Sequence, residues 1–222
     1  MYNPVTRTIT FRTNHFSVFF VSEWISPFGD VARSDWFYRA VRFAYSGGLM
    51  TGTSADAFAP NTNLTRAMLV TILHRYAGEP NSPLSSLLSP LFTDVAEGTW
   101  YTDAVAWASA NGIVEGVGDN RFDPDAVITR EQLAVILYRY ASVAQLSVVS
   151  GQWSVDGGYG QVDLGSYTDG GLTSGWAADA VRWAVAQGII TGVSDTSIAP
   201  QGSATRAQTA TMLQRFDDVI AR

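Results

Sequence analysis

Three copies of one residue pattern run along the sequence, so the fold must be built from three similar units. Each copy opens with an aromatic residue, a variable residue and an aspartate, and a tryptophan follows six or seven residues later. A loop glycine and a Thr-Arg pair come further on, in the same order each time. The shared positions are Asp30, Asp94 and Asp169; Trp36, Trp100 and Trp176; Gly52, Gly116 and Gly192; and Arg66, Arg130 and Arg206.

The first half of each unit is predicted to be a helix. In the second copy, apolar residues recur at helical spacing from Trp100 to Ala108. Gly112 ends this helix, because glycine readily adopts the left-handed conformation of a C-terminal cap. The aromatic residues inside these helices are predicted to be core, and they are Phe43, Trp107 and Trp183.

The second half is predicted to be a helix that starts at the Thr-Arg pair. In the second copy the Thr129 hydroxyl caps the first turn and Gln132 completes a capping box. Thr205 and Gln208 repeat this box, whereas Met68 leaves it incomplete in the first copy. Helices of about a dozen residues with one apolar face are marginal alone. We therefore predict a mainly α fold in which three helix-loop-helix repeats form one pseudo-threefold body.

The units are separated by Pro-, Ser- and Gly-rich segments. The predicted boundaries are repeats at 27–78, 91–142 and 167–222, linkers at 79–90 and 143–166, and a strand and linker at 1–26. Residues 8–21 alternate as in a strand, with no partner strand elsewhere in the chain. We interpret them as the short β segment that remains from an upstream β domain, the cargo of the repeats.

Composition narrows the class of partner. The chain has 222 residues, 46% of them hydrophobic and 12% aromatic, which is typical of a folded protein. Its net charge of −6 and lack of a basic stripe argue against a nucleic-acid partner. No run of about 18 apolar residues predicts a membrane span. The absence of cysteine excludes disulfides and thiolate metal sites.

No catalytic or metal-binding constellation is evident. The two histidines, His15 and His74, do not occupy matching repeat positions, and both are interpreted as structural or solvated. The acidic stretch 119–125 lacks the glycine and glutamate frame of a calcium loop. We expect no enzyme activity, no cofactor and no metal in this chain.

The conserved Thr-Arg spacing suggests either of two roles for the arginine. An arginine at the first helical position is unfavourable with the helix dipole, and an anion site of guanidinium and free backbone N–H groups would offset that. Alternatively, each arginine pairs with one of the repeated aspartates. The repeated tryptophans begin their helices, where an exposed indole face suits stacking on a sugar. Each aspartate either accepts from sugar hydroxyls or serves as a cap.

Taken together, these segments resemble surface-layer homology (SLH) repeats. The resemblance covers residues 28–77, the second copy from Phe92 onward, and 167–216, and its Thr-Arg-Ala-Glu signature stands here as TRAM, TREQ and TRAQ. No copy keeps the final Glu, and Glu131 places a carboxylate near the proposed anion site of the second copy. The resemblance implies a three-pronged spindle of helix pairs with grooves between the prongs. It also implies that Gly52, Gly116 and Gly192 let the backbone approach a ligand.

The family implies an anchoring function at the bacterial surface. Its members hold exported proteins to secondary cell-wall polysaccharide, often through a pyruvylated amino sugar, whose ketal pyruvate is a carboxylate. We therefore expect an extracellular glycan-binding anchor in which the arginines grip the carboxylate, the aspartates take hydroxyls and the tryptophans stack. Two alternatives stay open: a protein-interaction or S-layer self-assembly module, and a contribution to an enzyme whose catalytic domain lies upstream.

Overall fold

A computed structural model describes residues 2–3, 8–9, 24–80, 92–144 and 162–220. Its six α-helices are α1 (Tyr38–Ser46), α2 (Arg66–Tyr76), α3 (Thr102–Ala110), α4 (Arg130–Val143), α5 (Ala178–Ala186) and α6 (Arg206–Ile220). The third repeat adds three 3₁₀ turns, which are η1 (Leu164–Ser166), η2 (Gly170–Leu172) and η3 (Gly175–Ala177). The predicted mainly α fold with three repeats is confirmed.

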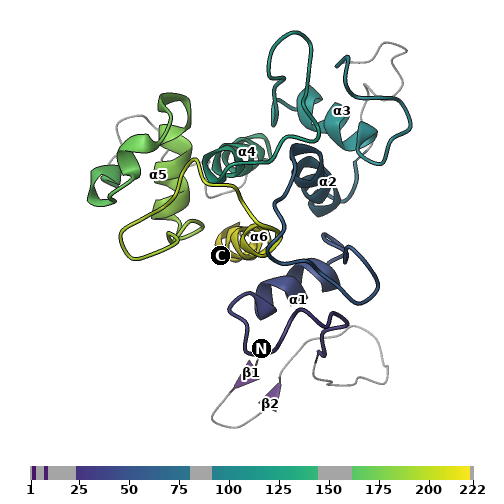
Figure 1. Ribbon diagram of the computed structural model, residues 1–222, viewed down its shortest axis with the longest axis vertical. Coiled ribbons are helices and arrows are strands. Elements are labelled where there is room, and N and C mark those ends of the chain that lie inside the picture. Colours follow the sequence, from purple (N-terminus) through teal and green to yellow (C-terminus); the bar gives the residue numbers. More distant parts are fainter. Residues whose placement is uncertain (1, 4–7, 10–23, 81–91, 145–161, 221–222) are drawn as a thin grey trace.

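The helices form a three-armed body. In Figure 1, α2, α4 and α6 are seen end-on at the centre, and α1, α3 and α5 lie outside them. The packed pairs are α2 with α3, α4 with α5, and α6 with α1. The second helix of each repeat thus packs on the first helix of the next repeat, and the last repeat packs on the first. Each arm is therefore shared by two repeats.

A ring of backbone hydrogen bonds closes the centre. The residue before each Thr-Arg pair donates its N–H to one neighbouring repeat and accepts from the other. Leu64 donates to the carbonyl of Ala204, Ala204 to that of Ile128, and Ile128 to that of Leu64, each at 2.9 Å. These bonds satisfy backbone groups that are buried in the middle of the molecule, where water does not reach them.

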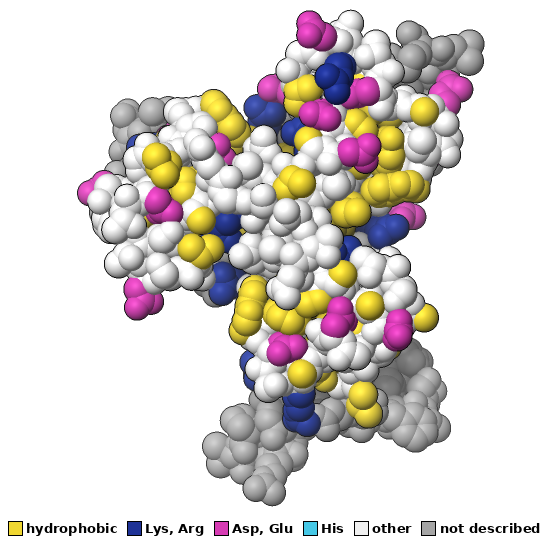
Figure 2. All heavy atoms as spheres, viewed as in Figure 1, with side chains coloured by type: hydrophobic (Ala, Val, Ile, Leu, Met, Phe, Trp, Pro, Cys, Tyr) yellow, Lys and Arg dark blue, Asp and Glu magenta, His cyan; other side chains and the backbone are white. Residues whose placement is uncertain are grey.

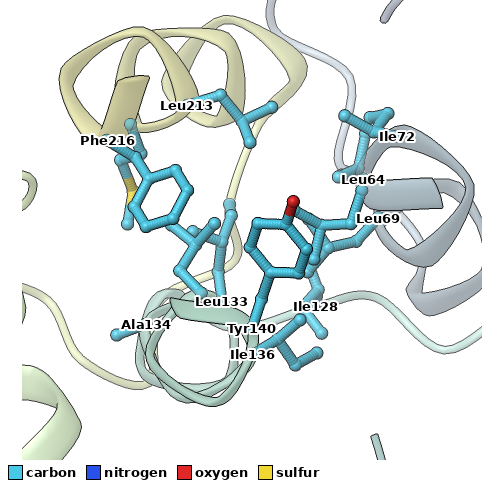
Figure 3. Close-up of a cluster of buried hydrophobic side chains, with 14 of the residues drawn as sticks. Leu64, Leu69, Ile72, Ile128, Leu133, Ala134, Ile136, Tyr140, Leu213 and Phe216 are labelled. Atoms are coloured by element: carbon cyan, nitrogen blue, oxygen red, sulfur yellow. The ribbon is translucent and has the colours of Figure 1, made fainter. Parts of the chain in front are cut away.

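The central helices bury a common apolar core. Side chains from α2, α4 and α6 point into the space between the three helices (Figure 3). Tyr76, Tyr140 and Phe216 occupy the same position in the three helices, and their ring centroids lie 5.9–6.0 Å apart. The Tyr76 hydroxyl also donates to Asp217 Oδ1 at 2.8 Å, so a polar contact joins the first and third repeats. Burial is the main reason that the pKa of Tyr76 is raised.

The local helix signals act as the sequence predicts. Gly112 has φ +68°, its N–H donates to the Ser109 carbonyl, and the N–H of Ile113 donates to the Ala108 carbonyl. This pair of bonds is a Schellman cap. Thr129 and Gln132 form the capping box. In the first repeat the Thr65 hydroxyl still accepts from the N–H of Met68, at 3.3 Å, so α2 begins at Arg66 without a box.

The N-terminal segment differs from the prediction. Strands β1 (Tyr2–Asn3) and β2 (Thr8–Ile9) pair antiparallel, with Tyr2 opposite Ile9. The expectation that the 8–21 strand has no partner in the chain is therefore wrong for its first two residues. The partner is a two-residue strand, too short for an alternating pattern to mark it. The rest of that predicted strand lies outside the described residues, as do most of both linkers.

No helix within the described ranges combines the length and apolarity needed to cross a bilayer. None of α1 to α6 is therefore a candidate membrane-spanning helix.

We expect Phe216→Ala to destabilise all three arms together, because this fully buried ring contacts side chains of the other two repeats. The free energy of unfolding, measured by urea denaturation, should fall by about 3–5 kcal/mol. Val143→Ala, at the exposed end of α4, is the matched control and should change it little. A small effect of Phe216→Ala would argue against a shared core.

Candidate functional site

The three repeated arginines reach out of their own repeats. Arg66 donates from Nε to the Phe122 carbonyl at 2.9 Å and from Nη2 to the Glu115 carbonyl at 3.0 Å. Arg130 and Arg206 are placed in the same way in the next two positions around the ring. The Nε atom of Arg130 donates to the backbone carbonyl of Ile198 at 2.9 Å, and that of Arg206 to the carbonyl of Phe58 at 2.8 Å. Arg206 Nη2 also donates to the backbone carbonyl of Thr51 at 2.5 Å. All three side chains are buried.

The sequence left open what the repeated arginines bind, and these hydrogen bonds answer part of that question. The acceptors are backbone carbonyls of the next repeat rather than the repeated aspartates. A flat ring lies beside two of the guanidinium groups: Arg66 Cζ is 4.7 Å from the centroid of Phe122, and Arg206 Cζ is 4.6 Å from that of Phe58. Burial lowers the pKa of both arginines, and the attraction of Asp94 for Arg66 and of Asp30 for Arg206 opposes that.

The N-terminal N–H groups of the second helices are already bonded. The N–H of Arg66 donates to Ala126 at 2.9 Å, and that of Ala67 donates to Pro124 at 3.0 Å. The same two bonds recur at α4 and α6 with the following repeat. The expectation that these N–H groups are free for an anion is therefore wrong, because the neighbouring repeat takes them.

Each repeated aspartate holds a loop of its own repeat. Asp94 accepts from the N–H groups of Phe122 at 2.7 Å and Asp123 at 2.8 Å. Asp30 makes the same pair of bonds with N–H groups 28 and 29 residues ahead, and Asp169 with N–H groups 29 and 30 residues ahead. The second donor residue has positive φ, +59° for Asp123, and the carboxylate stabilises that turn. Both oxygens of each aspartate are thus occupied within the protein.

The loop glycines are required by close packing of the loop on itself. A Cβ at Gly116 would lie 2.7 Å from the Arg121 carbonyl and 2.9 Å from the Phe92 ring. At Gly52 the nearest atom, the Ser54 carbonyl oxygen, would be 2.3 Å away. These distances are too short for any side chain. The loop needs glycine to close on itself, whether or not a ligand approaches.

The two sets of repeated aromatic residues differ in their solvent exposure. Trp36, Trp100 and Trp176 are 66%, 61% and 62% exposed, as the start of a helix allows. Trp107 and Trp183 are buried, which confirms them as core, and Phe43 is half-buried against the core. The exposed indoles therefore offer a face to solvent at equivalent places on the three arms.

Two grooves bring these elements together. The repeat-2 groove encloses about 200 Å³, and its lining includes Arg66, Glu115, Gly116, Gln132, Arg139 and Trp176. The repeat-3 groove encloses about 350 Å³, and its lining includes Arg130, Thr191, Gly192, Gln208, Arg215 and Trp36. All three repeats contribute to each groove. One repeat provides the Thr-Arg arginine, the next provides the loop and the second helix, and the remaining one provides the tryptophan. None of the three repeated aspartates lines either groove.

Basic side chains lie in the recesses between the arms in the space-filling view (Figure 2). A second arginine series occurs at Arg75, Arg139 and Arg215, nine residues after each Thr-Arg arginine, and Arg139 and Arg215 line the two grooves. Arg215 donates to the Thr191 hydroxyl at 2.8 Å, and Arg139 pairs with Glu115 at 3.3 Å. The sequence analysis missed this series, although its constant spacing in the three copies is visible in the sequence.

Glu131 has a structural role. Its carboxylate accepts from the N–H of Ser174 at 2.9 Å and from the hydroxyl of Ser174 at 2.8 Å, and the residue is buried. It therefore fastens the start of the third repeat to α4. The carboxylate that was expected to disturb the second anion site is instead committed to this contact.

The described residues hold no group of three or more His, Cys, Asp or Glu side chains that is arranged to bind a metal ion. His74 lies at a hydrogen-bonding distance of 3.0 Å from the Pro80 carbonyl and 5.2 Å from the Trp107 ring, which fits the structural role expected for it. His15 lies outside the described residues.

Comparison with known proteins gives one family. The profile of the S-layer homology domain matches residues 27–67, 91–134 and 166–210. An amylopullulanase of Thermoanaerobacterium thermosulfurigenes is 28% identical over 93% of this chain and 10% of its own length. The cellulosome-anchoring protein of Acetivibrio thermocellus is 25% identical over 77% of this chain and 34% of its own. The S-layer protein sap of Bacillus anthracis is 30% identical over 50% of this chain and 13% of its own. This chain thus spans between a tenth and about a third of these relatives.

We expect Arg66→Ala to destabilise the fold as well as to change the groove. The substitution leaves the buried carbonyl of Phe122 without its donor, which costs roughly 1–3 kcal/mol, and it also removes the donor to the carbonyl of Glu115, an exposed residue. Thermal unfolding measured by circular dichroism would reveal this as a lower melting temperature. Arg42→Ala, at an exposed position of α1, is the control. An unchanged melting temperature would mean that Arg66 does not link the repeats.

Asp169 should make the free energy of unfolding depend on pH in the acid range. A hydrogen bond from Ser197 and two from the backbone hold the pKa of Asp169 below its ordinary value of 3.8. The ionised form is therefore favoured by folding, so this stabilisation is complete above about pH 4 and is lost as the pH falls further. Urea unfolding from pH 7 to pH 3 should show Asp169→Asn less stable at pH 7 and flatter below pH 4. Asp218→Asn, an exposed control, should follow the wild type. Parallel curves for Asp169→Asn and the wild type would contradict this.

Proposed function

The chain belongs to the S-layer homology domain family, and from that membership we propose that it anchors an exported protein to the bacterial cell surface. In this proposal the anchor is non-covalent and extracellular, and its partner is an anionic secondary cell-wall polysaccharide that carries pyruvate. The repeats bind and do not catalyse.

The observation that carries the proposal is the composition of the two grooves. Each places a guanidinium group and an exposed indole around one space. A guanidinium binds a carboxylate through two parallel hydrogen bonds, and an indole face packs on the apolar C–H face of a sugar ring. An amide, Gln132 in one groove and Gln208 in the other, adds a donor and an acceptor for hydroxyls. A sugar that carries a carboxylate uses all three.

The remaining candidate residues, the repeated aspartates and glycines, shape the loops. We assign Asp30, Asp94 and Asp169 to holding the loops, because their oxygens are occupied by backbone N–H groups. Gly52, Gly116 and Gly192 let the same loops close. The sugar hydroxyls are then met by the amides and by the loop backbone instead of by the aspartates.

The relatives support an anchoring role that serves other domains. One is named as a cellulosome-anchoring protein and another as an S-layer protein, whereas a third is named as an amylopullulanase. In the amylopullulanase the aligned segment is 10% of the protein. We propose the same division here, with the repeats as the anchor and a cargo domain upstream in the same protein.

A second candidate is self-assembly, which the similarity to S-layer proteins favours. In that case the grooves bind a segment of another protein copy. The two functions differ in what removes binding: extraction of the polysaccharide abolishes anchoring to the wall, but it leaves association between protein copies intact.

The test is sedimentation with purified cell-wall sacculi, before and after extraction of the secondary polysaccharide. The variant is Trp36→Ala/Trp100→Ala/Trp176→Ala, since these side chains are exposed and their loss spares the fold. We expect binding to weaken about tenfold or more for each occupied groove, because a stacking surface is lost. The arginines are less suitable, since they also hold the repeats together.

Ile25→Ala is the matched control, because Ile25 is a large apolar side chain that is 82% exposed. It should bind sacculi as the wild type does. Wild-type binding by the tryptophan triple variant would contradict the groove assignment. Equal binding to extracted and intact sacculi would contradict the polysaccharide, and a measured change in oligomeric state would then favour self-assembly.

A further inference from the structure

The two grooves differ in charge at one equivalent position. The residue before the loop glycine is Glu115 in the repeat-2 groove and Thr191 in the repeat-3 groove. The other repeated polar positions match, with a Thr-Arg arginine, a second arginine and a glutamine in each. This exchange is the one difference in formal charge between the two linings.

In the repeat-2 groove both arginines have partners in the protein. Arg139 Nη2 lies 3.3 Å from Glu115 Oε2, and Arg66 Nη2 donates to the carbonyl of the same Glu115. The Phe122 ring lies beside Arg66 as well. An incoming carboxylate would compete with Glu115 for Arg139 and would meet its negative charge at close range, which weakens binding.

In the repeat-3 groove the arginines keep unused donors. Within the described residues Arg130 donates one hydrogen bond, from Nε to Ile198, and neither Nη nitrogen has an acceptor. Ile198 also stands where the other two repeats have a phenylalanine, so no ring lies under this guanidinium. Arg130 is only 4% exposed, and the groove that it lines is where its free donors are accessible.

The second arginine adds to the positive charge of the repeat-3 groove. Arg215 Nη1 donates to neutral acceptors, the Thr191 hydroxyl at 2.8 Å and the Ile189 carbonyl at 3.3 Å. Burial lowers the pKa of Arg130, and the nearby charge of Arg215 lowers it further. Asp169 attracts Arg130 and opposes this lowering of its pKa, but the described lining of the groove contains no carboxylate, so a bound anion would stabilise the two positive groups that face it.

We propose that, of these two grooves, the repeat-3 groove binds the carboxylate ligand and that Glu115 prevents the repeat-2 groove from binding the same ligand. The ligand class is a sugar with one carboxylate, gripped by Arg130 and Arg215 with Trp36 against its ring. Glu115 is thus a specificity-determining residue that acts by occupying Arg139. The inference rests on the proposed function, whose glycan it assigns to one groove.

Reciprocal exchange of the two residues tests this. The probe is the methyl glycoside of a pyruvylated N-acetyl amino sugar, with the same glycoside without pyruvate as the control ligand, titrated by calorimetry at low salt. Thr191→Glu should weaken binding about tenfold or more, since a carboxylate then pairs with Arg215. Glu115→Thr should add a second binding event in the repeat-2 groove. The control Glu97→Thr removes the same charge from an exposed position outside both grooves and should change nothing.

Two tryptophan variants locate the binding. Trp36→Phe in the wild type should weaken binding of the probe, whereas Trp176→Phe should matter only in the Glu115→Thr background. High salt should shrink the effect of Thr191→Glu, because the repulsion is electrostatic and the groove is open to solvent.

The outcomes separate this inference from the proposed function. If the wild type binds sacculi and the pyruvylated probe, yet both exchanged variants behave as the wild type does, this inference is overturned and the anchor stands. Sensitivity to Trp176→Phe instead of Trp36→Phe in the wild type overturns it too. If the wild type binds neither the probe nor sacculi, the proposed function fails and the inference falls with it.

Discussion

The ring of backbone hydrogen bonds through Leu64, Ile128 and Ala204 is the constraint on which the rest of the structure depends. It fixes the starts of the three central helices around one axis, so that each helix must pack on the first helix of the following repeat. The contact of α6 with α1 then closes the circle. A single repeat has neither of these partners, and its two short helices would be marginal in water. Folding and closure are therefore one event in this chain.

The same junctions create the grooves. A Thr-Arg pair starts a central helix, and its arginine crosses to the loop of the next repeat, where it satisfies buried carbonyls and lines a cavity. An arginine in this position does two things at once, which explains why the helix tolerates a positive charge at its first residue. Loss of the guanidinium would remove both these hydrogen bonds and the proposed ligand contact, and so the exposed tryptophans are the cleaner probes of binding.

Pseudo-threefold symmetry in the backbone does not make the three repeats equivalent in chemistry. Met68 removes half of a capping box, yet α2 begins where its counterparts do because the neighbouring repeat bonds its first N–H groups. Glu131 fastens the third repeat to the second. Glu115 pairs with Arg139, whereas the equivalent Arg215 donates to the Thr191 hydroxyl. One scaffold thus carries local substitutions with three separate consequences, and only the last concerns the ligand.

The sequence by itself determined the three helix-loop-helix units, the Gly112 cap, the Thr129 box and the buried and exposed aromatic sets, because those depend on contacts within a turn or two of helix. It did not reveal that both oxygens of each repeated aspartate bind a loop nearly thirty residues away. Nor did it determine the partner of Arg66, since three copies offer the same acceptors and no local rule selects among them. Only the tertiary structure decided that, because ring closure leaves each arginine one neighbour within reach.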